Sequence, residues 1–352
     1  MLVRAPNWLG DSVLAAPAVV ALRGALPGAH VAVLAREGVA DFWRMLPVDE
    51  VISFGRVGGW GGVRARWETA RVVRAKRFGV ALILPNSFDA ALVPWLAGVP
   101  TRVGWGTDGR WLLINQRIPF PHRLEGQSQA RRYVYLVEQW LGYALEQALE
   151  VRLAVPGEAR AEVAAATVGW PGCVIGLNPG ATYGTAKCWL PDRFAEIACR
   201  AHARLGARVV IVGGAGDRSR CEWVFSLISQ AAGDAGTWCV NLAGTTSVCT
   251  LAAWLERCSC LVTNDTGAMH VAAAVGTPVV AIFGPTDWRT TAPLGDGHRL
   301  IRASVPCAPC LRRVCEIDHR CMKSVSVEEV WEAVMQVCAQ REKASIRLSN
   351  PT

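Results

Sequence analysis

The sequence predicts an α/β protein made of two similar halves, each a doubly wound parallel sheet, with a cleft between them. Three observations support this prediction. Strand-like and helix-like segments alternate from the N-terminus onward, the alternation restarts at Cys173, and an Ala-rich stretch bracketed by Pro-Gly pairs, residues 152–172, separates the two series. A chain of 352 residues, with 51% hydrophobic and 19% charged residues, is long enough and apolar enough for two cores.

The first strand–helix–strand unit carries an acidic residue at the predicted mouth of its sheet. A strand begins at Leu2, residues 4–12 form a loop, and a helix follows over 13–26. Asp11 lies at the end of that loop, where a carboxylate can accept a proton from a bound hydroxyl group. The alternative is that Asp11 only caps the helix, a role that Ser12 could also fill.

The rest of the first half contains a strongly basic segment. Residues 56–77 are rich in Arg, Gly and Trp, which is typical either of a solvated helix face or of a docking surface for an anionic acceptor. Strands over 80–84 and 100–105 and a helix over 131–145 continue the alternation. We place the connection between the halves at 152–172.

The second half repeats the pattern and brings three loops to one place. Its predicted strands cover 173–177, 208–212, 239–241 and 261–263, and its predicted helices cover 191–205, 220–231 and 247–257. The carboxyl ends of parallel strands meet at one edge of a sheet. We therefore expect the loops 178–189, 213–217 and 264–270 to converge there.

Two of these loops have side chains suited to a nucleotide. The first contains the hydroxyls of Thr182, Tyr183 and Thr185 and the ammonium of Lys187, which can surround a diphosphate. In the second, GGAGD at 213–217, glycines allow close approach and Asp217 can bind ribose hydroxyls. That run lacks the full GxGxxG pattern, so it is not specific by itself.

The third loop opens the stretch NDTGAMHVAAAVGTPVVAIFGP, residues 264–285, which predicts a small-residue helix followed by a buried strand. Asp265, Thr266 and Gly267 stand at the helix start, where free N–H groups and partial positive charge suit a phosphate. His270 is expected to face the same mouth. The alternative is an ordinary βαβ crossover with a good helix cap.

The charge balance favours an anionic partner. The net charge is +8, which suits nucleic acid, a phosphorylated sugar or an acidic membrane surface. Nucleic acid is disfavoured, because neither an aromatic stacking platform nor an RNA motif is evident. The chain has no GxxxxGK[ST] motif, no Asp-x-Asp metal clamp, no apolar run of membrane-spanning length and no signal-peptide layout at its start. We expect a cytoplasmic protein that docks peripherally on the inner membrane.

Thirteen cysteines make up a high count. Many, such as Cys173 and Cys239, sit singly in apolar segments and are interpreted as small core residues. Near the end of the chain four cysteines have a C-x2-C-x4-C-x5-C spacing, with His319 close by: Cys307, Cys310, Cys315 and Cys321. They are a candidate structural zinc site, and the alternatives are free thiols or a disulfide.

Six motifs together resemble a known family: NWLGD at 7–11, LPNSF at 84–88, ALVP at 91–94, GW at 104–105, NPGATYGTAKCW at 178–189 and the stretch 264–285. They resemble the ADP-heptose:lipopolysaccharide heptosyltransferases, glycosyltransferase family 9. LPNSF and ALVP look most like heptosyltransferase II. The resemblance runs to about Leu300.

The resemblance implies a GT-B fold, in which two Rossmann-like domains face a central cleft. The implied division is an acceptor-binding domain at 1–160, an ADP-sugar domain at 161–325, and a helix and tail at 326–352 that cross back to the first domain. It further implies inverting, metal-independent transfer without a cofactor, from ADP-L-glycero-D-manno-heptose to the first heptose of a lipid A-linked inner core, at the cytoplasmic face of the inner membrane.

The resemblance also implies roles for the residues singled out above. Asp11 becomes the general base and Lys187 stabilises the departing diphosphate. The implied donor-binding residues are Thr182, Tyr183, Asp217, Asp265, Thr266, Gly267 and His270. Two alternatives stay open: heptosyltransferase I or another transferase of the family with a different acceptor, and a basic nucleotide-binding module without catalysis.

Overall fold

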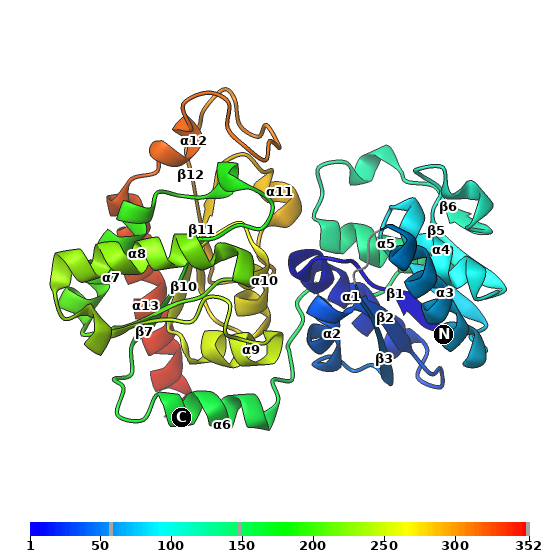
Figure 1. The fold of residues 1–352 in the computed structure, drawn as a ribbon, viewed down its shortest axis with the longest axis horizontal. Coiled ribbons are helices and arrows are strands. Elements are labelled where there is room, and N and C mark those ends of the chain that lie inside the picture. Colours follow the sequence, from blue (N-terminus) through cyan, green and yellow to red (C-terminus); the bar gives the residue numbers. More distant parts are fainter. Residues whose placement is uncertain (56–58, 147–148, 350–352) are drawn as a thin grey trace. The chain divides into compact units, whose positions relative to one another are not determined.

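The structure, a computed structural model, describes the backbone of residues 1–55, 59–146 and 149–349, and the side chains of 1–55, 62–146 and 149–341 (Figure 1). The chain divides into two compact units, Met1–Ala154 and Val155–Thr352. The division falls a few residues before the predicted boundary at 160. Each unit contains its own six-stranded sheet, in which every pairing is parallel.

The first unit alternates strands and helices along the chain. Its elements are β1 (Leu2–Arg4), α1 (Leu9–Ala25), β2 (Ala32–Arg36), α2 (Glu37–Arg44), β3 (Glu50–Phe54), α3 (Gly59–Ala75), β4 (Val80–Ile83), α4 (Phe88–Leu96), β5 (Thr101–Trp105), β6 (Gln116–Ile118) and α5 (Gln129–Leu141), with short 3₁₀ turns η1 (Arg110–Leu112) and η2 (His122–Leu124). The strand order is β3-β2-β1-β4-β5-β6. The chain therefore reverses its direction of travel across the sheet between β1 and β4.

The second unit repeats that topology. Its elements are α6 (Gly157–Ala166), β7 (Val174–Asn178), η3 (Thr185–Lys187), α7 (Pro191–Leu205), β8 (Arg208–Ile211), η4 (Ala215–Asp217), α8 (Arg218–Ala232), η5 (Ala235–Thr237), β9 (Cys239–Asn241), α9 (Val248–Arg257), β10 (Cys260–Asn264), α10 (Gly267–Ala274), β11 (Val279–Phe283), α11 (Trp288–Thr291), β12 (Arg299–Arg302), α12 (Arg320–Lys323) and α13 (Val327–Ser349). The order β12-β11-β10-β7-β8-β9 puts the reversal between β7 and β10.

The sequence explains why these segments fold as they do. Every residue of β7, β10 and β11 is buried, as expected for strands that are covered on both faces, and these runs are rich in Val and Ile. Helix α7 begins with Pro191 and ends at Gly206, whose φ of 59° is a left-handed conformation that glycine adopts without a steric penalty. Trp189 and Phe194 pack edge to face beneath α7 and are fully buried.

Two sequence expectations about helix positions differ from the structure. Helix α1 begins at Leu9 and not at residue 13, so Asp11 belongs to its first turn, where a carboxylate is favourable beside free N–H groups. Ser12 does not cap the helix, because its buried hydroxyl donates to the carbonyl of Pro6 at 3.2 Å. The edge strands β3, β6 and β12 were not predicted.

The final helix, α13, packs against α7, β10, β11 and β12, all in the second unit. Figure 1 shows it in red among those elements. Its side chains Val330, Val334 and Val337 are fully buried in the core of that unit. The predicted crossing of this segment to the first domain stays a prediction. Within the described residues no helix is both long and apolar enough to traverse a bilayer.

Candidate active site

The point of reversal between β7 and β10 is where polar side chains gather in the second unit. The strands pair in a register that sets Thr263 beside Asn178, so the loops that follow them leave the sheet side by side. In open α/β sheets, ligands bind at such a position, outside the carboxyl ends of the strands. This edge therefore meets the topological condition for a binding site.

Asn264, the last residue of β10, holds two of these loops together. It is fully buried, its Oδ1 accepts from the backbone N–H of Trp189 at 2.9 Å, and its Nδ2 donates to the carbonyls of Pro179 and Gly180 at 2.9 and 3.1 Å. The sequence analysis assigned Asn264 no role. An amide at the end of an otherwise apolar strand was the signal that could have identified it.

Lys187 and Asp265 form the ion pair at the centre of this edge. The Nζ of Lys187 lies 2.7 Å from Oδ2 of Asp265, and the two side chains are only 12% and 5% exposed. The same carboxylate oxygen accepts from Thr291 Oγ1 at 3.5 Å, and the ammonium lies 4.8 Å from the ring centroid of Tyr183. The structure thus places Lys187 and Tyr183 of the first loop in contact with Asp265 or with each other.

The start of α10, directly after Asp265, has no side-chain cap. Thr266 is the residue before the helix and has extended backbone geometry, with its hydroxyl 3.3 Å from that of Thr263 and no side-chain bond to the helix N–H groups. Gly267 begins the helix. First-turn N–H groups without a side-chain cap, together with the partial positive charge of the helix start, are suited to an anion.

His270 is buried in the first turns of α10, and its Nδ1 has no hydrogen-bond partner among the described residues. Burial lowers its pKa to about 4, against an opposing effect of Asp265 and in the same direction as the charge of Lys187. The imidazole is therefore neutral at pH 7. Oδ1 of buried Asn178 also has no partner in the described part of the chain. Both atoms could bind a polar group of a ligand.

The loop after β8 meets the same edge through Asp217. A Cβ placed on Gly180 would lie 2.2 Å from Cγ of Asp217, so only glycine at 180 allows this approach. Oδ2 of Asp217 accepts from the N–H of Gly214 at 3.1 Å. Thr182 lies on the intervening loop and is exposed. The predicted donor-binding residues therefore lie in the loops after β7, β8 and β10 or in the first turns of α10.

Asp11 lies in the other unit, in the first turn of α1, and α1 packs along α5. Burial, and to a lesser degree the negative charge of Asp11, raises the pKa of Tyr133 on α5, so this phenol is protonated at neutral pH. Nearby, buried Arg4 ends β1 and donates to Asn7 Oδ1 at 2.7 Å. Arg4 thereby ties down the loop that leads to Asp11. The sequence analysis assigned Arg4 no role.

Comparison with known proteins supports one family. Residues 66–320 match the sequence family described as Glycosyltransferase family 9 (heptosyltransferase). Lipopolysaccharide heptosyltransferase 2 of Escherichia coli K12 is 31% identical over 309 residues, covering 86% of this chain and 87% of that protein. The chain belongs to glycosyltransferase family 9.

Solved structures agree with this assignment. The structure of E. coli ADP-heptose LPS heptosyltransferase II superposes with a TM-score of 0.82 at 29% identity, covering 97% of this chain and 99% of that one. A further sequence relative, lipooligosaccharide heptosyltransferase 2 of Haemophilus influenzae, is 27% identical over 86% of this chain and 88% of its own length. The two parallel-sheet units are those of the GT-B fold, which confirms the predicted fold class and family.

The zinc hypothesis for the cysteine-bearing segment of this family 9 protein stays a prediction. Cys307, Cys310, Cys315 and Cys321 all have free thiols. Among the residues with described side chains, no three His, Cys, Asp or Glu side chains are placed to hold a metal ion. Cys310 is exposed whereas Cys321 is buried beside Gly284. Burial, and to a lesser degree the charges of Cys307, Cys315 and Cys310, raises the pKa of the Cys321 thiol.

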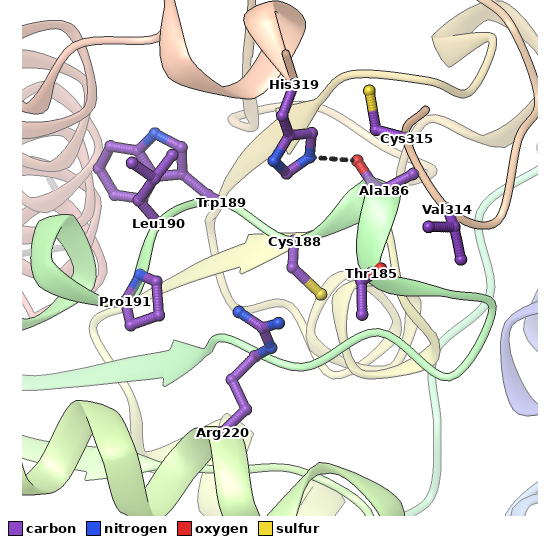
Figure 2. A pocket seen from close by; sticks show the side chains of 10 residues that line it. All are labelled: Thr185, Ala186, Cys188, Trp189, Leu190, Pro191, Arg220, Val314, Cys315 and His319. Carbon is purple, nitrogen blue, oxygen red and sulfur yellow. Dashed lines mark hydrogen bonds between the residues drawn. The ribbon is translucent and has the colours of Figure 1, made fainter. Parts of the chain in front are cut away.

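A pocket of about 230 Å³ adjoins the loop after β7, beside the predicted donor residues. Figure 2 shows Arg220 reaching into it from α8, and His319 facing the backbone of Ala186, where its Nε2 lies 2.9 Å from the carbonyl oxygen. Cys188 and Cys315 line it as well. The residues that line this pocket include neither Lys187 nor Asp265, so it is separate from the site around their ion pair.

Proposed function

We propose that this protein is a lipopolysaccharide heptosyltransferase 2, which transfers heptose from ADP-heptose to the first heptose of the lipid A-linked inner core. The names of its relatives in E. coli and Salmonella typhimurium, both 31% identical, support this activity. The observation that carries it is the Lys187–Asp265 pair, 2.7 Å apart and nearly buried, at the uncapped start of α10. An ammonium and free N–H groups at the switch point of a parallel sheet suit a diphosphate.

In this proposal the second unit binds the sugar nucleotide. The diphosphate lies against the first turn of α10 and the Lys187 ammonium, and Thr266 and Gly267 form the floor of the site. Asp217 binds the ribose hydroxyls, and Thr182 contributes its hydroxyl to the phosphates. When the bond from the anomeric carbon to the diphosphate breaks, the charge on the leaving ADP grows. These fixed positive groups compensate it, so transfer needs no metal.

The first unit supplies the base. Asp11 accepts the proton of the acceptor hydroxyl. The oxygen of that hydroxyl attacks the anomeric carbon from the face opposite the diphosphate, which inverts the configuration. Burial and, to a lesser degree, the charge of Asp11 raise the pKa of Tyr133, so a protonated phenol adjoins this carboxyl group. The acceptor is lipid-linked, and the net charge of +8 suits the anionic cytoplasmic face of the inner membrane.

The test offers ADP-heptose with three acceptors, a core without heptose, a core with one heptose and a core with two, and reads the products by mass. We expect addition only to the acceptor with one heptose. Addition only to the heptose-free core would instead establish heptosyltransferase I activity. ADP binding without transfer to any of the three would favour the nucleotide-binding module.

The same assay tests the base. Asp11→Asn should lower transfer on the order of 10²–10⁴-fold while ADP affinity, measured by calorimetry, stays unchanged. Asp41→Asn is the matched control, because Asp41 makes only a half-exposed pair with Arg44 on α2 and should leave transfer at the wild-type rate. Full activity of Asp11→Asn would exclude Asp11 as the base.

A further inference from the structure

Residues Leu311 and Arg313 of the cysteine-bearing segment contact two loops at the carboxyl edge of the second sheet. We call this edge, which carries the predicted donor-binding residues, the donor edge. The carbonyl of Arg313 accepts from the N–H of Ala186 at 3.0 Å, within the turn that carries Lys187. The carbonyl of Leu311 accepts from the phenol of Tyr183 at 2.7 Å, and its N–H donates to the carbonyl of Pro285 after β11 at 2.7 Å. This short segment thus connects the loop after β7 with the loop after β11.

Two cations lie over the ring of Tyr183. The ammonium of Lys187 lies 4.8 Å from its ring centroid, and the guanidinium carbon of Arg313 lies 5.3 Å from it. A cation within about 6 Å of an aromatic ring centroid, over the face, is attracted by the ring. The hydroxyl of the same ring is fixed to the Leu311 carbonyl. The orientation of the ring that contacts the Lys187 ammonium therefore depends on the 311–313 segment.

We propose that Arg313, acting through the ring of Tyr183, positions the Lys187 ammonium for the departing diphosphate, which makes Arg313 a positioning residue for the transfer reaction. This inference rests on the proposed function. A lysine head group on a flexible four-carbon stem loses rotamer freedom when it is held in place. Asp265 restrains it on one side and Tyr183 on another. An ammonium already in place compensates the leaving-group charge without reorganising during the reaction.

A change in the position of Lys187 should weaken the binding of free ADP more than the binding of ADP-heptose. Free ADP has on its terminal phosphate the charge that develops during bond breaking, whereas ADP-heptose does not. A misplaced ammonium therefore lowers the affinity for ADP more than the affinity for ADP-heptose. It also lowers kcat more than it raises KM. Arg313 is exposed and Tyr183 is 39% exposed, so neither variant removes a core contact.

The experiment compares four variants of the full chain with wild type by calorimetry and steady-state kinetics. Arg313→Ala and Tyr183→Leu should weaken ADP binding and lower kcat about 2- to 5-fold, the range for one exposed cation–π contact, with affinity and KM for ADP-heptose unchanged. Tyr183→Phe keeps the ring and should retain most of kcat. Arg312→Ala is the matched control, because the neighbouring Arg312 pairs with Glu316 and should behave as wild type.

A double-mutant cycle tests whether Arg313 acts through Lys187. In a Lys187→Ala background, Arg313→Ala should have no further effect on ADP affinity. An undiminished effect of Arg313→Ala in that background would show that Arg313 touches the nucleotide itself, and so would equal loss of affinity for ADP and ADP-heptose. Either result would overturn the proposal. Wild-type behaviour of Arg313→Ala would overturn it as well. The calorimetric result needs no acceptor, so it separates this inference from a wrong acceptor assignment.

Discussion

Lys187 and Asp265 show how burial gives single residues their importance in this protein. With 12% and 5% of their side chains exposed, each is the main compensation for the charge of the other. Removing one partner of such a pair leaves an uncompensated buried charge, which typically costs about 3–5 kcal/mol of stability. Loss of activity in a Lys187 variant therefore has to be separated from loss of folding, and ligand binding is the more informative measurement.

His270 provides a pH test at the same scale. Burial lowers its pKa in the folded protein to about 4, whereas the unfolded value is near 6.5. As pH falls from 6.5 to 4, the unfolded chain takes up a proton at this residue and the folded chain does not. The stabilising contribution is therefore complete above pH 6.5 and is lost as pH falls to 4, by about 3 kcal/mol at most.

We expect the unfolding free energy of wild type, from denaturant titrations between pH 7 and 4.5, to fall more steeply than that of His270→Gln. His122→Gln is the control, because that side chain is 98% exposed and should leave the slope unchanged. Identical slopes for wild type and His270→Gln would show that folding does not lower the pKa of His270.

At the scale of elements, glycines decide how closely the loops of the donor edge approach one another. A Cβ on Gly184 would lie 2.2 Å from the carbonyl oxygen of Arg313, which is a backbone atom and cannot rotate away. Gly180 has the same relation to Asp217, although there the neighbour is a side chain. The loop after β7 can therefore occupy its position only with glycine at 184.

Gly184→Ala should consequently displace either the turn that carries Lys187 or the 311–313 segment. We expect transfer to fall on the order of 10–10²-fold, because small displacements of catalytic groups have effects of that size. Gly236→Ala is the control in the same unit, since nothing lies within 4 Å of its Cβ. Wild-type kinetics of Gly184→Ala would indicate that the two segments adjust without moving Lys187.

At the scale of the whole molecule, charge sets the expected relation to a membrane. The net charge is +8, and no helix in the described part of the chain could cross a bilayer. Attraction of a basic protein to anionic lipids is electrostatic, and salt screens it over a Debye length of about 10 Å at 0.1 M.

We therefore expect the protein to co-sediment with vesicles containing phosphatidylglycerol at about 0.1 M salt and to be released at about 0.5 M. Phosphatidylcholine vesicles are the control and should not retain it. Retention on both vesicle types at high salt would indicate an apolar anchor and would refute electrostatic docking.

Local pattern explains what could be predicted. The strand–helix alternation, the restart at Cys173, and the three loops after β7, β8 and β10 follow from periodicity and from breakers such as Pro191 and Gly206. Because parallel strands put their carboxyl ends at one edge, Lys187, Asp217 and Asp265 could be grouped before any coordinates were known. The start of α1 was misplaced because Asn7 to Asp11 has no strong cap signal, and no side chain caps that helix in the structure.

The sequence by itself determined the fold class, the family and the chemical types of side chain at the donor edge, since these depend on spacing within a few turns or strands. Only the tertiary structure decided the contacts between distant residues: Lys187 with Asp265, 78 positions apart, and Tyr183 with Leu311, 128 positions apart. The physical reason is that periodicity records which face of an element is buried, whereas the partner across a loop is selected by packing of the whole unit.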